Sequence, residues 1–254
     1  MSDLTLVQTN PWEELRAHTP ARIALGRVGA SLPTAEVLRF GLAHAQARDA
    51  VHLPLDVARL QSELDAAGFR TLRVASEAGD RRTYLLRPDK GRRLRAEDHA
   101  RLELEPAAPE IAILVADGLS SIAIQRHAGP LLMAFRERFG TDWLATPVVL
   151  AEQGRVALGD GVGEALRARL MIVLIGERPG LTSPDSLGIY ITWQPRVGRM
   201  DSERNCISNV RPEGLTYPAA AAKLAFLAGQ AIRLQLTGVD LKDESDLQPL
   251  TLPT

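Results

Sequence analysis

The chain has 254 residues, of which 45% are hydrophobic and 24% charged, and 30 Lys+Arg against 31 Asp+Glu leave a formal net charge of -1. These values are typical of a globular protein of one or two domains, and balanced charge with 4% aromatic residues argues against a nucleic-acid-binding protein. The single cysteine excludes an intrachain disulfide and suits the cytoplasm, and we expect neither a membrane-spanning helix nor a secretory signal.

The first third of the chain is expected to be mainly helical. A polar N-terminal tail over 1–20 precedes an irregular, glycine-rich segment. Pro33 then introduces a helix over 35–51, whose apolar residues recur at helical spacing, and a second helix covers 55–69.

A basic stretch over 81–94 follows these helices. Five of its fourteen residues are Arg and one is Lys. Such a stretch is either an exposed linker with solvated charges or a docking surface for an acidic partner, and the sequence leaves both interpretations open. We assign 21–108 as a helical N-terminal region together with this linker.

From Glu110 onward, apolar runs of strand length alternate with helical patterns. Near-continuous apolar strands alternating with helices are typical of a parallel sheet covered on both faces. We therefore predict an α/β fold over 109–238, a Rossmann-like mostly parallel sheet flanked by helices, followed by a C-terminal tail over 239–254. The predicted strands cover 110–117, 146–152, 171–176 and 186–193, and the helices cover 118–139, 161–170 and 217–236.

Ligands in an open α/β sheet bind at the carboxyl ends of strands, so the loops after the strands are the candidate sites. These loops are 117–120, 176–180 and 194–214. The segment 159–166 resembles a phosphate-binding loop but has Glu164 where G-x-G-x-x-G requires a glycine, which disfavours a dinucleotide enzyme. The five histidines are scattered without metal-ligand spacing, so we predict no metal site.

The loop after the third predicted strand carries an adjacent acid and base, Glu177 and Arg178. Neighbouring residues on an extended segment point in opposite directions, so we expect one to face a ligand and the other a neighbouring loop. We expect Gly176 to allow close backbone approach. Cys206 has no histidine near it in sequence, which favours a small, partly buried residue over a nucleophile. The sequence therefore predicts a ligand-binding domain without a catalytic set.

Six segments, in this order, resemble the small (light) subunit of ethanolamine ammonia-lyase over roughly residues 20–238. They are ARIALGRVGASLPT, LAHAQARDAVH, RPDKGRRL, VADGLSS, IGERPGL and RNCISNVRPEGL. The sequence departs from the family pattern at Lys90, where an apolar residue is expected.

The resemblance implies an adenosylcobalamin-dependent lyase that converts ethanolamine to acetaldehyde and ammonia, with cobalt carried by the corrin. It implies a large partner subunit, a (β/α)8 barrel, that holds the substrate and the catalytic residues, and a cofactor bound at the subunit interface. Val156, Glu177 and Cys206 are the cobalamin-contacting residues that it implies for this chain. The expected location is the cytoplasm, with a bacterial microcompartment as a further option.

The sequence also leaves open a function of a different class. The chain would then be a standalone α/β ligand-binding or scaffolding protein without catalytic activity.

No histidine is preceded by aspartate two positions earlier, so we expect cobalamin to bind with its own dimethylbenzimidazole on cobalt.

Overall fold

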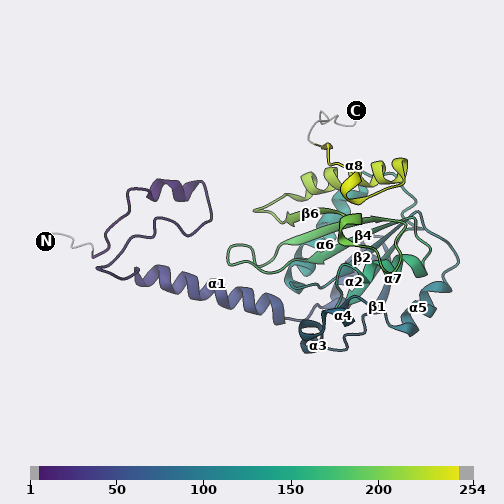
Figure 1. The fold of residues 1–254 in the computed structure, drawn as a ribbon, viewed down its shortest axis with the longest axis horizontal. Coiled ribbons are helices and arrows are strands. Elements are labelled where there is room, and N and C mark those ends of the chain that lie inside the picture. The colour runs from purple at the N-terminus through teal and green to yellow at the C-terminus, as the bar shows by residue number, and fades with distance from the viewer. Residues whose placement is uncertain (1–5, 246–254) are drawn as a thin grey trace.

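The computed structural model describes residues 6–245, so the outer ends of both predicted tails, 1–5 and 246–254, lie outside the described residues. A six-stranded sheet in the order β1-β3-β2-β4-β5-β6 forms its centre (Figure 1). The first four strands in this order are parallel neighbours, and β5 is antiparallel to both β4 and β6. The predicted mostly parallel α/β sheet is therefore confirmed. The strands are β1 (Arg70–Ala75), β2 (Ile111–Ala116), β3 (Pro147–Glu152), β4 (Leu170–Gly176), β5 (Leu187–Trp193) and β6 (Asn205–Val210).

Helices cover the sheet on both sides. The first face packs against α2, α6 and α8, and the second face packs against α5 and α7. Because successive side chains of a strand point to opposite faces, Ile113 of β2 belongs to the first layer and Leu114 to the second, and both are fully buried. The α-helices are α1 (Thr34–His52), α2 (Val57–Ala66), α3 (Arg81–Leu86), α4 (Pro88–Gly91), α5 (Ala96–Glu103), α6 (Ser121–Arg136), α7 (Leu158–Ala165) and α8 (Tyr217–Leu234). Short 3-10 helices are η1 (Glu13–Ala17), η2 (Asp201–Glu203) and η3 (Gly238–Asp240). No helix in this part of the chain is both long and apolar enough to cross a membrane.

Two strands were not predicted from the sequence. Strand β1 lies within 21–108, which was expected to be helices and linker, and it pairs in parallel with β3. Strand β6 lies within the segment 194–214, which was expected to be a loop, and it carries Cys206. Both are edge strands with exposed polar side chains, so neither has the apolar run of a buried strand.

The second face is left without a helix over β5 and β6. Helices α6 and α8 pack against these two strands from the first face, whereas α7 packs against β2 and β4 on the second face. Parallel strands require a crossover connection, commonly a helix, but antiparallel neighbours do not. The chain passes from β4 to β5 through a loop, and from β5 to β6 through a loop that contains only the short 3-10 helix η2, so neither connection places an α-helix on this part of the sheet.

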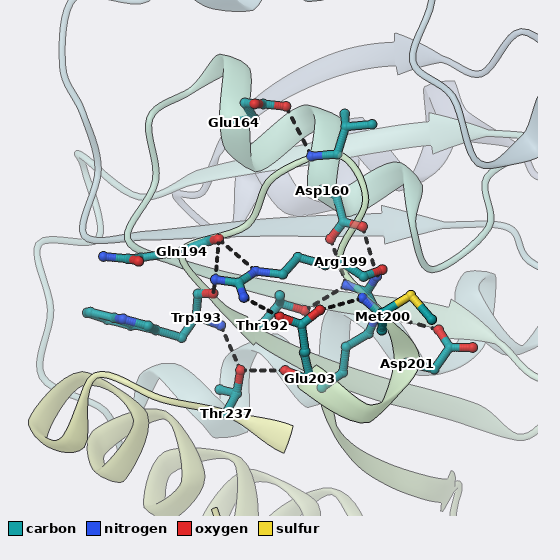
Figure 2. A network of polar contacts seen from close by, with 12 residues as sticks. Asp160, Glu164, Thr192, Trp193, Gln194, Arg199, Met200, Asp201, Glu203 and Thr237 are labelled. Carbon is teal, nitrogen blue, oxygen red and sulfur yellow. Dashed lines mark hydrogen bonds and ion pairs between the residues drawn. The ribbon is translucent and has the colours of Figure 1, made fainter. Parts of the chain in front are cut away.

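The loop between β5 and β6 is fastened to α7 by a buried ion pair (Figure 2). The Arg204 guanidinium donates two parallel hydrogen bonds of 2.6 and 2.8 Å to the two carboxylate oxygens of Asp160. It also donates to the Thr192 hydroxyl at 3.1 Å. Burial raises the pKa of Asp160, and the hydrogen bonds and charge of Arg204 oppose that rise. The ion pair covers the second face of the sheet at the C-terminal end of β5, the end opposite Leu187.

A second arginine organises the same loop. Arg199 donates to the backbone carbonyls of Trp193 and Gln194, each at 3.1 Å, and pairs with the carboxylate of Glu203. Figure 2 shows its guanidinium between these groups. The loop is therefore held by its own side chains as well as by α7.

The stretch 81–94 forms two short helices, α3 and α4, and not a solvated linker. Tyr84 is fully buried. The Cζ atoms of Arg81 and Arg155 lie 4.7 and 4.3 Å from the centroid of its ring. Four other arginines of the stretch, at 82, 87, 92 and 93, are exposed. The stretch is therefore folded and holds a buried tyrosine, and whether its exposed arginines are solvated or dock a partner stays a prediction.

Residues 6–53, which we call the N-terminal arm, project from the side of the α/β body (Figure 1). Only Ala43 and Ala50 of α1 are buried, although the helix is rich in apolar residues. Leu38 and Leu42 are 68% and 60% exposed. The arm thus presents apolar side chains that the described part of the chain does not cover.

We predict that Arg204→Met lowers the free energy of unfolding by about 3–5 kcal/mol, because the Asp160 carboxylate would stay buried without its cation. Urea denaturation at low protein concentration measures this loss. Arg138→Met is the control, because this guanidinium is partly exposed and lies 3.9 Å from the carboxylate of its neighbour Glu137, so we expect little change. Equal effects of the two substitutions would contradict a structural role for the buried pair.

Candidate functional site

The three residues implied as cofactor contacts lie on the second-face side of the sheet. Val156 comes between β3 and α7, Glu177 follows β4, and Cys206 lies in β6. Strand register places Cys206 opposite Tyr190 of β5, and Val156 and Tyr190 both pack against the second-face apolar cluster. We call the surface formed by Tyr190, Cys206 and Ser208, beside the buried Gly188, the open face.

Glu177 stands at the edge of the open face. Its carboxylate accepts a hydrogen bond from the backbone N–H of Asn209, at 3.3 and 3.4 Å from the two oxygens. The side chain crosses Gly188, where an added Cβ would lie 3.0 Å from Oε1. Asn209 has φ +60°, a left-handed conformation, and its carbonyl accepts from Leu215 N at 2.8 Å. The end of β6 therefore holds the Glu177 carboxylate over a glycine while leaving it half-buried.

Gly176 permits the close approach that the sequence predicts. Its carbonyl accepts from Leu119 N at 2.9 Å, and an added Cβ would lie 2.1 Å from the Ser120 carbonyl oxygen. Gly118 meets it from the other side with φ +58°. The loops after β2 and β4 are thus in backbone contact, and only glycine fits at that contact.

Arg178 differs from its neighbour Glu177, as expected for adjacent residues of an extended segment. It is exposed, and within residues 6–245 it makes no hydrogen bond or ion pair. Arg178 therefore does not fasten the loop, and Glu177 is the residue bound to a neighbouring turn.

The segment 177–186, which we call the lip, is anchored from the first-face side. The Asp185 carboxylate pairs with Arg126 of α6 at 2.8 Å and with Arg211 at 3.7 Å. His127 of α6 lies beside it, with Nε2 3.6 Å from Asp185 Oδ2, and burial lowers the pKa of this imidazole. The Ser120 hydroxyl donates to the Pro184 carbonyl at 2.9 Å. These contacts anchor the C-terminal end of the lip.

Cys206 is exposed, so the expectation of a partly buried thiol is wrong. Its Sγ lies 3.4 Å from the Ser208 hydroxyl, and strand pairing places it beside Tyr190. Burial raises the pKa of Tyr190 above its ordinary value, and the neighbouring Cys206 and Glu177 raise it further. The thiol's described polar partners are thus hydroxyl groups, which is not the thiol–histidine arrangement of a cysteine nucleophile.

Tyr190 was not singled out from the sequence. Strand β5 reads as a uniform apolar strand, but its even positions, Gly188, Tyr190 and Thr192, are small or polar and lie on one face. Its odd positions, Ile189 and Ile191, belong to the first-face core. This alternation is the signal that marks the uncovered side of the strand.

The crevice between the carboxyl ends of β2 and β3 is filled by the chain itself. Asp117 is buried, accepts from Gly154 N at 3.0 Å and lies 3.4 Å from Arg81, and burial raises the pKa of its carboxyl to about 6. Arg81 also donates to the Gly118 carbonyl at 2.8 Å. The position where an open α/β sheet commonly binds its ligand is therefore occupied by a structural arginine.

The glycines of segment 159–166 serve helix packing. An added Cβ at Gly159 would lie 2.6 Å from Val173 of β4, and one at Gly163 would lie 2.4 Å from Pro195. Glu164 accepts from the backbone N–H of Val197 at 3.1 Å. Across the described residues, no group of three or more His, Cys, Asp or Glu side chains is placed to hold a metal ion.

Comparison with known proteins gives consistent matches along the chain. The family model for the ethanolamine ammonia-lyase light chain matches residues 9–242. The ethanolamine ammonia-lyase small subunit of Azotobacter vinelandii is 57% identical over 255 residues, covering 98% of this chain and 94% of the relative. The small subunit of Ralstonia nicotianae is 56% identical, covering 95% of this chain and 91% of the relative. That of Pseudomonas putida is 53% identical, covering 98% of this chain and 94% of the relative.

We predict that Gly176→Ala lowers the free energy of unfolding by about 1–3 kcal/mol, because the new methyl group would press on the Ser120 carbonyl. Thermal unfolding of the chain measures the effect. Gly229→Ala in the exposed interior of α8 is the matched control, since nothing lies within 4 Å of its added Cβ. That control should stabilise the chain by roughly 0.5–1 kcal/mol. Unchanged stability of Gly176→Ala would show that the two loops are not in backbone contact.

Proposed function

The chain belongs to the family of ethanolamine ammonia-lyase small subunits, and we propose that it binds adenosylcobalamin on the open face, at the interface with the large subunit of the enzyme. The observation that carries the proposal is that Glu177 and Cys206 both neighbour Tyr190, on the face of β5 and β6 opposite to α6 and α8. As a small subunit, the chain is part of a carbon–nitrogen lyase and has a large-subunit partner.

The side chains of the open face suit a corrin. A corrin is a broad apolar ring with neutral amide side chains around its rim, so it needs a flat surface and hydrogen-bond acceptors more than a phosphate cradle. Gly188 adds no side chain to this surface, and Tyr190 and Cys206 supply apolar contact. The Glu177 carboxylate has one backbone donor, Asn209, and keeps acceptor capacity for an amide N–H. Val156 adds apolar contact from the α7 side.

The chain's own contribution is binding, orientation and exclusion of water. When bound, adenosylcobalamin supplies radical chemistry through homolysis of its cobalt–carbon bond. Around the open face, the thiol of Cys206 has a serine and a tyrosine beside it, and the nearest carboxylate, that of Glu177, is bound to a backbone N–H. Such groups hold a ligand but do not form a nucleophile–base pair, so we place the residues that act on ethanolamine on the large subunit.

The exposed thiol also bears on location. Cys206 is a free cysteine on the surface. A reducing compartment keeps such a thiol from oxidising, so we propose the cytoplasm as the site of action.

We propose that the N-terminal arm docks on the large subunit. A helix that exposes apolar residues around most of its circumference gains little from the α/β body alone, so α1 requires a further surface to cover it. Trp12 in the same arm is 66% exposed and Phe40 is 45% exposed. The same feature argues against the standalone binding or scaffolding protein, which has no reason to present such a helix to water.

We predict that Glu177→Ala raises the dissociation constant of the reconstituted two-subunit complex for cobalamin by roughly 10–100-fold, the equivalent of about 1.5–3 kcal/mol for a hydrogen bond to a charged group. Titration followed by corrin absorbance measures it. Glu137→Ala, an exposed carboxylate at the end of α6, is the control and should leave affinity unchanged. An unchanged affinity for Glu177→Ala would remove this residue from the cofactor site.

We predict that the isolated chain is poorly soluble and that Leu38→Glu with Leu42→Glu makes it more soluble while abolishing co-purification with the large subunit. Both effects follow from placing charge on the exposed apolar surface of α1. Leu144→Glu, at an 80% exposed position on the α/β body, is the control and should co-purify normally. A monodisperse, concentrated preparation of the unmodified chain alone would contradict the docking role of the arm.

A further inference from the structure

Tyr190 occupies the centre of the open face. It is paired in register with Val173 of β4 on one side and with Cys206 of β6 on the other. Along its own strand it follows Gly188, whose added Cβ would lie 3.4 Å from Cε2 of the tyrosine ring. The same virtual Cβ would lie 3.2 Å from Cγ of Glu177. The ring therefore lies in the gap between the two residues implied as cofactor contacts.

The environment of the ring changes from one edge to the other. One side packs against the second-face apolar cluster beneath α7, and the residue remains half-exposed. Thr192, the next residue on this face of β5, is capped by Arg204 and is buried. Tyr190 has no corresponding cap, since the described hydrogen bonds of the Arg204 guanidinium go to Asp160, Thr192 and the Arg199 carbonyl. A tyrosine that only filled the sheet surface would be covered as Thr192 is.

The chemistry of the phenol suits a large ligand with neutral polar groups. A tyrosine ring provides a rigid apolar surface, and its hydroxyl can hydrogen-bond at the edge. A tyrosine hydroxyl is protonated near neutrality at its ordinary pKa, and burial raises the pKa of Tyr190 further. The hydroxyl therefore presents a donor and an acceptor without charge, which matches an amide group better than a phosphate.

We propose that Tyr190 is a further cofactor-contact residue, whose ring packs against the corrin between Glu177 and Cys206 and whose hydroxyl bonds to a corrin amide. The inference rests on the proposed function and extends it to a residue that the family resemblance did not supply. It adds an aromatic contact to a site otherwise made of small residues and one carboxylate.

The test measures the affinity of the reconstituted two-subunit complex for cyanocobalamin by corrin absorbance. Tyr190→Ala removes ring and hydroxyl and should weaken binding roughly 30-fold, as loss of a buried aromatic contact does. Tyr190→Phe keeps the ring and should weaken binding by roughly 2–5-fold. The matched control is Tyr217→Phe, whose hydroxyl lies 2.8 Å from His127 Nδ1 between α6 and α8, and it should bind normally.

A second measurement needs no substitution. Hydroxyl-radical footprinting of the unmodified complex, with and without cyanocobalamin and read by mass spectrometry, should show Tyr190 protected by the cofactor and Tyr217 unaffected. If Glu177→Ala weakens binding while Tyr190 shows neither weakened binding nor protection, the inference is overturned and the proposed function stands. If neither the Glu177 nor the Tyr190 substitutions change affinity, the open face is not the cobalamin site, and both fail.

Discussion

The antiparallel pairing of β5 with β4 is the constraint on which the rest of the structure depends. Each parallel connection, from β1 to β2, from β2 to β3 and from β3 to β4, runs through helices that cover one face or the other. After β4 the chain reverses, so the second face receives no further helix. Strand β6 then returns beside β5, and α8 goes to the first face. An uncovered patch of sheet follows directly from this topology, and it is where a flat ligand can lie.

An uncovered patch keeps its shape only if its borders are rigid, and two different interactions provide that rigidity. At one end, the Arg204–Asp160 pair ties the loop after β5 to α7, in a geometry that compensates for burying both charges. At the other end, Gly176 and Gly118 bring two loops into backbone contact, and Asp185 anchors the lip beyond them. The first is electrostatic and the second steric, so they fail under different substitutions.

The sequence predicted the central strands because buried parallel strands carry continuous apolar runs, as 171–176 does. It did not predict β1 or β6, because edge strands face water on one side and lose that run. Glu177 could be placed at a strand end from its position after Gly176, but its bond to Asn209 depends on the pairing of a strand 32 residues later in the chain. The exposure of Cys206 had no signal in its neighbours, since it follows from the lack of a described helix on the second face of β6.

The N-terminal arm and the lip, far apart in sequence, are in contact. Arg22 of the arm donates a hydrogen bond of 3.1 Å to the Leu181 carbonyl, and its guanidinium lies 5.6 Å from the centroid of the Phe40 ring in α1. A partner surface that covers α1 is therefore also linked to the lip, the segment that carries Glu177. A subunit that forms one wall of a cofactor site at an interface needs both surfaces, since a ligand held on one side is shielded from water only once the partner is seated. We therefore propose that this chain shapes the cofactor site and that the reacting groups belong to the partner.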